Sequence, residues 1–206
     1  MITPVLLKRS LLVLVAATFF FGCGKLRNTD NYRWSVKTLT DRDAGRLIFG
    51  TARASSVAEQ TRMPMPTLTQ DSPRQQSIED SLFIIDALLL AVKIESDGDF
   101  HLIIRDLQTD STMLAEIPDP DAAWTTQCSH SEEFRSAREV IGRIAGPTYG
   151  SLRHLAMPIR IRLAGIGFFD PVHFMPSEEG IPANWREIHP VVKVEVLQGE
   201  ALAKTP

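Results

Sequence analysis

The chain has 206 residues, of which 22 are Lys or Arg and 25 are Asp or Glu, giving a formal net charge of −3 at pH 7. This mild acidic excess argues against strong non-specific binding to nucleic acid, which depends on clustered Lys and Arg. Hydrophobic residues make up 44% of the chain, a content typical of a packed globular domain and not of a disordered tail.

The N-terminus has the pattern of a secretory signal peptide. Lys8 and Arg9 precede the apolar run 11–21, and Cys23 lies between two glycines. A basic patch, a short apolar core and a small residue before the cleavage site define such a signal. The apolar run has about a dozen residues, whereas a membrane-spanning helix needs about 20. We therefore expect residues 1–22 to be removed.

A cysteine directly after the expected cleavage site resembles a bacterial lipoprotein, in which this residue becomes the diacylated N-terminus. Lipidation of Cys23 would hold the domain at the bacterial cell envelope, on the periplasmic side of a membrane. Ordinary cleavage and an uncleaved anchor are the alternatives. Removal of residues 1–22 takes away two basic residues and no acidic one, so the processed chain would carry −5. With Cys23 lipidated, Cys128 is alone and no internal disulfide can form.

The remaining chain divides into a tether, an extension, a domain and a tail. The expected segments are a lipidated tether (23–33), an N-terminal extension packed on the domain (34–80), an OB-like domain (81–198) and a disordered tail (199–206). In the extension, residues 34–40 favour an early strand, and residues 54–61 favour a short helix capped by Ser55 or Ser56. Residues 63–76 contain three prolines, which predict a loop.

The domain begins with a predicted three-stranded meander. Residues 82–94 are apolar on both faces, which predicts a long buried strand, although composition alone also fits a helix. Asp97-Gly98 favours a two-residue hairpin turn after this strand. Residues 99–107 and 112–117 then supply the second and third strands.

After the meander the hydrophobic period changes to that of a helix. Ser129 stands three residues before Glu132, which predicts a capping box, and Gly146 followed by proline predicts the helix end. The apolar stripe between them consists of Phe134, Ala137, Val140, Ile141 and Ile144. Alternating residues in 157–168 and 191–197 predict the last two strands.

The predicted order is three strands, one helix and two strands. This is the order of an OB-fold barrel, in which the helix closes the end of the barrel between strands three and four. Closure of the sheet would also protect the edges of the apolar first strand. The sequence therefore predicts a mainly β, OB-fold-like domain with an N-terminal extension. A non-barrel α+β sandwich is the alternative.

Several motifs carry a resemblance to known proteins. These motifs are VKTLTD (36–41), DGDFH (97–101), AEIPDP (115–120), GFFDPVHF (167–174) and EIHP (187–190). Together they resemble an uncharacterised family of secreted bacterial proteins, over most of the mature chain. Within that pattern, Glu187 is the acidic residue before the last His-Pro, and His173 is the histidine after Gly-Phe-Phe-Asp. The resemblance implies one domain and carries no established activity.

The first candidate site lies on the second strand. Asp99, His101 and Arg105 share one face of that strand, on which alternate side chains are about 6.5 Å apart. His101 would be a general base or a metal ligand, with Asp99 orienting it. With a two-residue turn, His101 would pair with Ile94. The alternative is that His101 satisfies local hydrogen bonds and that Arg105 is a solvated surface charge.

A second candidate site involves the long loop 169–188. His173, Trp185 and His189 are the candidate ligand-binding residues, because this loop borders the usual ligand groove of OB domains. The aromatic side chains that would offer stacking faces, or else pack in the core, are those of Phe168, Phe169, Phe174 and Trp185. If the loop folds back, Asp170, His173 and His189 would meet His101 and suffice for Zn²⁺.

These candidates lead to two hypotheses. The leading one is a lipid-anchored envelope protein whose OB-like domain binds a small molecule, a glycan or a protein without catalysis. The alternative is a metal-dependent hydrolase that uses His101 with His173 or His189. A nuclease-like version of it would use Arg105, Asp106, Glu116 and Asp119 to hold a cation and a phosphate. The sequence names no cofactor, and it contains no phosphate-binding loop, G-x-S-x-G or H-E-x-x-H motif.

Overall fold

The structure is a computed structural model that describes residues 33–47, 51–69, 71–125, 128–170 and 179–197. All of these residues fall within one compact unit. The expected signal peptide, Cys23, His173, Phe174 and the expected tail lie outside the described residues. No helix within the described ranges is long and apolar enough to cross a membrane.

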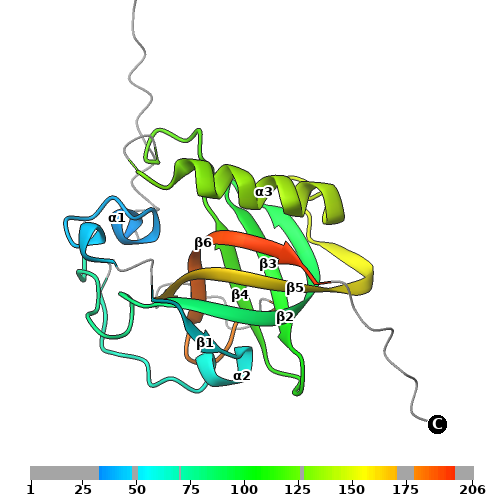
Figure 1. The fold of residues 1–206 in the computed structure, drawn as a ribbon, viewed down its shortest axis with the longest axis horizontal. Helices are drawn as coiled ribbons and strands as arrows, with labels where there is room; N and C mark the ends of the chain where they lie inside the picture. The colour runs from blue at the N-terminus through cyan, green and yellow to red at the C-terminus, as the bar shows by residue number, and fades with distance from the viewer. Residues whose placement is uncertain (1–32, 48–50, 70, 126–127, 171–178, 198–206) are drawn as a thin grey trace, which may run out of the picture. The chain divides into compact units, whose positions relative to one another are not determined.

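Five strands pair in a closed ring (Figure 1). The six strands of the sheet are β1 (Arg53–Ser55), β2 (Leu82–Ile94), β3 (Phe100–Asp106), β4 (Thr112–Ile117), β5 (Arg153–Phe169) and β6 (Arg186–Val196). The ring runs β2-β3-β4-β6-β5 and returns to β2, while β1 adds a short parallel pairing to β2. The β4–β6 pair is parallel and the other ring pairs are antiparallel. The mainly β, OB-like layout predicted from the sequence is confirmed, as a closed ring of paired strands.

Strand β2 has the bounds predicted from its apolar run. Ile85, Ala87 and Leu89 are fully buried in the core of the ring. The strand pairs with β3 on one edge and with β5 on the other. The alternate residues Ile84, Leu88 and Leu90 are half-buried, so the second face is also partly covered, which is consistent with an apolar run that does not alternate.

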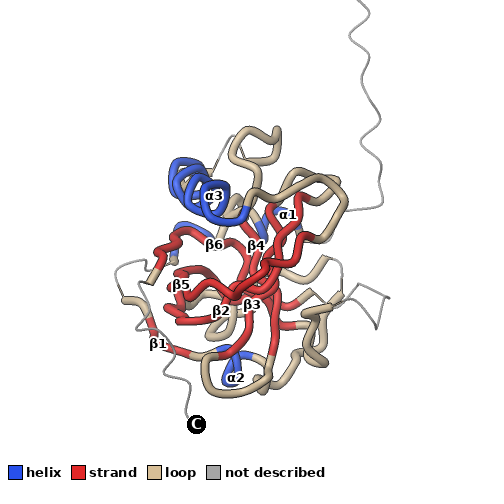
Figure 2. The backbone as a smooth tube through the Cα atoms, turned by 90° about the vertical axis from the view of Figure 1, so that its right-hand side faces the viewer, coloured by secondary structure: helices blue, strands red, loops and turns tan. Residues whose placement is uncertain are grey.

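Helix α3 (Ser131–Ala145) covers one end of the ring, and Figures 1 and 2 show it on the opposite side of the strands from helix α2 (Val57–Gln60). Its buried residues are Phe134, Ala137, Ile141 and Ala145. The helix ends at Gly146, whose φ of 54° is left-handed, as predicted. The predicted capping box at Ser129 is wrong, because the helix begins two residues later, with His130 as an N-cap that makes no side-chain capping bond.

The N-terminal extension is only partly as predicted. Residues Trp34–Lys37 form a short helix, α1, and not a strand. The turn is held by the Thr38 hydroxyl, which donates to the Trp34 carbonyl at 2.7 Å. A window of seven residues is too short to separate the two hydrophobic periods, which explains the error. The predicted cap of the next helix is confirmed: Ser56 and Glu59 form a reciprocal capping box at the start of α2.

The β2–β3 hairpin differs from the prediction by one residue. The Gly98 N–H donates to the Glu95 carbonyl at 3.0 Å, and the Glu95 N–H donates to the Asp99 carbonyl at 2.9 Å. Gly98 has a φ of 95° and ends a three-residue loop. His101 therefore pairs with Lys93 and not with Ile94. The error arose because Asp-Gly suits both loop lengths.

Strand β6 begins at Arg186, five residues before the predicted start at Val191. The predicted loop 169–188 therefore ends earlier than expected, and Pro190 lies inside the strand although it cannot donate to a ladder. The structure accommodates this proline at an irregularity, where Gly165 pairs with Val191 and Gly167 pairs with Ile188. A bulge leaves residues unpaired and so tolerates a proline inside a strand.

Candidate functional site

A cluster of charged side chains lies on the face of β3, β4 and β6 that is turned away from the core. Leu102, Ala115 and Ile188 point into the core, so their neighbours along each strand point to the opposite face. The register pairs His101 with Glu116. The parallel pairing of β4 with β6 then sets Glu116 beside His189.

Glu116 joins the two histidines. Its Oε1 lies 2.9 Å from His101 Nδ1, and its Oε2 lies 2.9 Å from His189 Nδ1. His101 Nδ1 is also 3.2 Å from Glu95 Oε1. The structure thus brings together two histidines that are remote in sequence, through a carboxylate that the site predictions had placed only in the nuclease-like set.

His189 has two further acidic neighbours. Its Nδ1 lies 3.2 Å from Glu187 Oε1, and its Nε2 lies 3.5 Å from Asp99 Oδ2. The other oxygen of Asp99 accepts the Asp119 N–H at 2.9 Å. His189 therefore contacts carboxylates on both sides of its ring.

Helix α1 adds a lysine to the cluster. Lys37 Nζ lies 2.7 Å from Asp170 Oδ2, at the end of β5, and 3.9 Å from Glu187 Oε1. Each of the five motifs quoted for the family resemblance therefore supplies a member. These members are Lys37, Asp99 and His101, Glu116, Asp170, and Glu187 and His189.

Burial and mutual pairing set the protonation of this cluster. Burial alone would lower the pKa of His101, but its hydrogen bonds to Glu116 and Glu95 raise that pKa to about 9. Burial would likewise lower the pKa of His189, whose contacts with Asp99, Glu116 and Glu187 raise it well above the usual value. Burial would raise the pKa of Glu116, whereas its bonds from the two imidazoles bring that pKa well below the usual range. Glu116 is therefore held ionised next to imidazolium groups, whereas burial and the nearby Glu116 carboxylate raise the pKa of Glu187.

Of the other predicted site residues, Phe168 borders this cluster, with its ring centroid 6.0 Å from that of His189, and the rest are not members of it or lie outside the described ranges. Arg105 is half-buried and lies opposite Thr112, toward the other end of β3. Phe168 and Phe169 are 1% and 0% exposed. Both therefore pack inside the domain. Trp185 is half-buried, and its carbonyl accepts the Asp170 N–H at 3.0 Å. His173 and Phe174 are not among the described residues.

Sequence reasoning did not assign a site role to Lys37. It also named Glu187 only as part of a motif. Both residues belong to the buried charges of the domain, with exposures of 7% and 5%. Glu187 and His189 are separated by one residue in a strand, so the period of two would have put them on one face. The position of Lys37 depends on how α1 packs, which no local pattern indicates.

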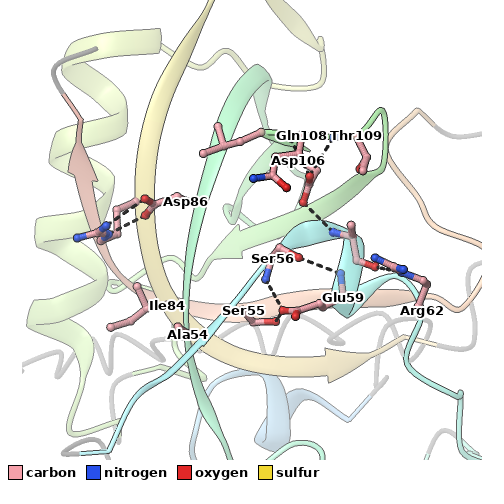
Figure 3. A pocket seen from close by; sticks show the side chains of 13 residues that line it. Ala54, Ser55, Ser56, Glu59, Arg62, Ile84, Asp86, Asp106, Gln108 and Thr109 are labelled. Atoms are coloured by element: carbon pink, nitrogen blue, oxygen red, sulfur yellow. Dashed lines mark hydrogen bonds and ion pairs between the residues drawn. The ribbon is translucent and has the colours of Figure 1, made fainter. Parts of the chain in front are cut away.

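The carboxylate of Asp106, a member of the nuclease-like set, accepts backbone N–H groups. Its oxygens accept from Ala58, Gln108 and Thr109, each at 3.0 Å. It thereby fixes the β3–β4 turn and the start of α2, as Figure 3 shows. Glu116, from the same set, is bonded to the two histidines. These contacts do not assemble a cation site beside Arg105.

The same region contains a surface hollow of about 570 Å³ (Figure 3). Its charged side chains are already paired with one another or with backbone groups. Glu59 accepts the Ser56 N–H at 2.9 Å, and Asp86 accepts from Arg162 at 2.6 Å. The hollow therefore offers fewer unpartnered polar atoms for a ligand than the histidine cluster does.

The chain is similar to no protein-family model, no curated protein and no solved structure in the comparisons with known proteins. The motifs that resemble secreted bacterial proteins thus stay a prediction. What the site can do must be argued from its own geometry.

Proposed function

We propose that this chain is a lipid-anchored protein of the bacterial cell envelope whose OB-like domain binds a ligand without catalysis. The ligand classes are a small molecule, a glycan and a protein partner. The observation that carries the non-catalytic part is the mutual pairing of the buried histidines. His101 and His189 are 5% and 1% exposed, and the Nδ1 atoms of both are bonded to Glu116.

A general base must come within about 2.6–3.2 Å of the proton that it removes from a substrate. The Nδ1 atoms of the two imidazoles already contact Glu116, and the raised pKa values of both histidines favour their protonated form. A protonated imidazole cannot accept a proton. This arrangement supports a binding domain over a hydrolase.

The proposed anchor rests on the pattern around Cys23. Two acyl chains on this residue would attach the domain to a membrane, since each buried CH₂ contributes about 0.8 kcal/mol. The membrane is thus the first expected partner. Nucleic acid is not an expected partner, because the processed chain would carry a net charge of −5.

The anchor is tested by expressing the full-length chain in a bacterium and separating membrane from soluble fractions. We expect the wild-type protein in the membrane fraction, with an intact mass that shows loss of residues 1–22 and a diacylated Cys23. Cys23→Ala should lose the lipid and leave that fraction. Cys128→Ala is the matched control and should remain there. An unmodified wild-type N-terminus would refute the anchor.

The absence of catalysis is tested with the mature chain in detergent. The probes are chromogenic phosphodiester and carboxylic ester substrates, each with Zn²⁺, Mn²⁺ or Ca²⁺. We expect no turnover above that of His101→Ala. The convergence of His101 with His189 is the observation that favours a hydrolase. Turnover that disappears in both His101→Ala and His189→Ala, with folding retained, would establish the hydrolase instead.

A further inference from the structure

We propose that Asp99, Glu116 and His189 form a binding site for one divalent transition-metal ion of the Zn²⁺ class. Each residue offers one ligand atom, and these three atoms lie within 4.8 Å of one another. The site goes beyond the proposed ligand-binding function and does not depend on the lipid anchor.

The distance between the two best-placed atoms fits a metal ion. His189 Nε2 and Asp99 Oδ2 are 3.5 Å apart. Zinc bonds to nitrogen and carboxylate oxygen are about 2.0–2.2 Å long and tetrahedral, which places neighbouring ligand atoms about 3.4 Å apart. A charge-assisted hydrogen bond between the same atoms would be about 2.7–2.9 Å long. The observed separation therefore matches a shared metal ion better than a shared proton.

The two atoms also lack other partners. Asp99 and His189 are 0% and 1% exposed, and neither Asp99 Oδ2 nor His189 Nε2 makes a hydrogen bond among the described residues. Buried polar atoms are nearly always bonded, so such atoms call for a partner. Asp99 Oδ2 and His189 Nε2 face each other, and one cation between them would be a partner for both atoms.

The surrounding contacts orient the ligands as in known metal sites. His189 Nδ1 faces Glu116 Oε2 at 2.9 Å and Glu187 Oε1 at 3.2 Å. Glu187 Oε1 is hydrogen-bonded to Nδ1 and holds the ring in the tautomer whose Nε2 can bind a metal once the ion displaces the Nε2 proton. Asp99 Oδ1 is likewise held by the Asp119 N–H, which leaves Oδ2 for the ion. Glu116 acts as the third ligand from β4.

The local charge favours a cation. The carboxylates linked through these contacts are those of Glu95, Asp97, Asp99, Glu116, Asp170 and Glu187. The cationic partners are Lys37, Lys93 and the two imidazoles. Carboxylates stay in excess even with both imidazoles protonated. One imidazole with two carboxylates suits Zn²⁺ or Mn²⁺, whereas Ca²⁺ prefers oxygen ligands only.

The site would join three strands at one point. Asp99 precedes β3, Glu116 is near the end of β4, and His189 lies in β6. A metal ion there would tie the hairpin and the meander to the last strand. We therefore expect the ion to raise the thermal stability of the domain, because it binds the folded state and not the dispersed ligands of the unfolded chain.

The test uses the mature full-length protein in detergent, purified without a histidine tag and stripped with EDTA. Zn²⁺ is titrated while bound metal is measured by mass spectrometry and Tm by circular dichroism. We expect about one equivalent of Zn²⁺ per chain and a higher Tm. Co²⁺ in its place should give the visible absorption bands of a tetrahedral site.

Two ligand variants, one variant of an outer contact and one control locate the ion. Asp99→Asn and His189→Gln preserve side-chain size and should each weaken Zn²⁺ binding by more than about 100-fold, while Glu187→Gln, which alters only the outer contacts, should weaken it about 10–100-fold. His154→Gln changes a histidine with a 57% exposed side chain and should bind as wild type. If His189→Gln does not fold, Asp99→Asn decides. A folded wild-type protein without stoichiometric Zn²⁺, or one whose binding survives Asp99→Asn, would overturn the proposal.

Discussion

Arg33 and Glu79 form a buried ion pair that fastens the start of the described chain to the ring. Arg33 Nη1 donates to Glu79 Oε1 at 2.9 Å, and the two side chains are 2% and 0% exposed. Glu79 also accepts the Phe169 N–H at 3.1 Å. One carboxylate thereby connects the residue before α1, the segment before β2 and the end of β5.

Glu79→Gln should destabilise the domain by about 3–5 kcal/mol, because it leaves the Arg33 guanidinium buried without its counter-charge. Urea unfolding followed by tryptophan fluorescence measures the loss. Asp121→Asn is the control, since it removes an ion pair with Arg135 at the surface and should change stability little. Equal losses in the two variants would contradict the assigned role of Glu79.

Gly165→Ala should destabilise the β5–β6 pair. An added Cβ at Gly165 would lie 2.4 Å from Ile188 Cγ2 and 2.7 Å from the Pro190 carbonyl oxygen, so the backbones would have to separate. Overpacking of this kind costs about 1–3 kcal/mol or more. Thermal unfolding measures the change.

Gly142→Ala provides the matched control for that substitution. A Cβ at Gly142 has no neighbour within 4 Å, and the residue lies inside α3. Alanine should therefore stabilise the domain by about 0.5–1 kcal/mol. If both glycine variants changed Tm in the same direction, the close approach at Gly165 would not govern stability.

Asp106→Asn should destabilise the domain at neutral pH by about 1.5–3 kcal/mol, the range for hydrogen bonds to a charged group. Burial would raise the pKa of Asp106, but the N–H groups of Ala58, Gln108 and Thr109 bring it below the usual 3.8. The stabilisation from this carboxylate is therefore complete well above pH 3.8 and is lost as pH falls through the lower, folded-state pKa.

The measurement is the free energy of unfolding of wild type and Asp106→Asn between pH 7 and pH 3. The difference between them should shrink toward the acid end. Asp86→Asn, which breaks the pair with Arg162 (46% exposed side chain), should have a smaller effect at pH 7. A difference that is independent of pH would show that the charge of Asp106 is not what stabilises the turn.

The sequence predicted correctly those strands that are marked by the residues within them and by the turns beside them. The apolar run of β2 and the bounds of β4 were correct because strand period and turn residues lie within each segment. The hairpin register failed because Asp97-Gly98 fits loops of two and of three residues. The prediction of a strand at the position of α1 was wrong because the pattern of burial there depends on what the segment packs against.

The histidine cluster needed information that no single segment holds. His101 and His189 meet because β4 pairs in parallel with β6, which sets Ala115 opposite Ile188. Sequence spacing does not specify the register of two strands so far apart. The residue types were visible from the sequence, but their convergence on Glu116 was not.

The pairing of β2 with both β3 and β5 has a consequence for how the chain reaches its native state. Leu82 pairs with Ile166, so one long edge of the apolar strand β2 stays unpaired until β5 has been synthesised. Contacts of such long range slow folding and leave an aggregation-prone edge exposed in the meantime. Truncations that stop before β5 should therefore yield insoluble products, even though the hairpins upstream are intact.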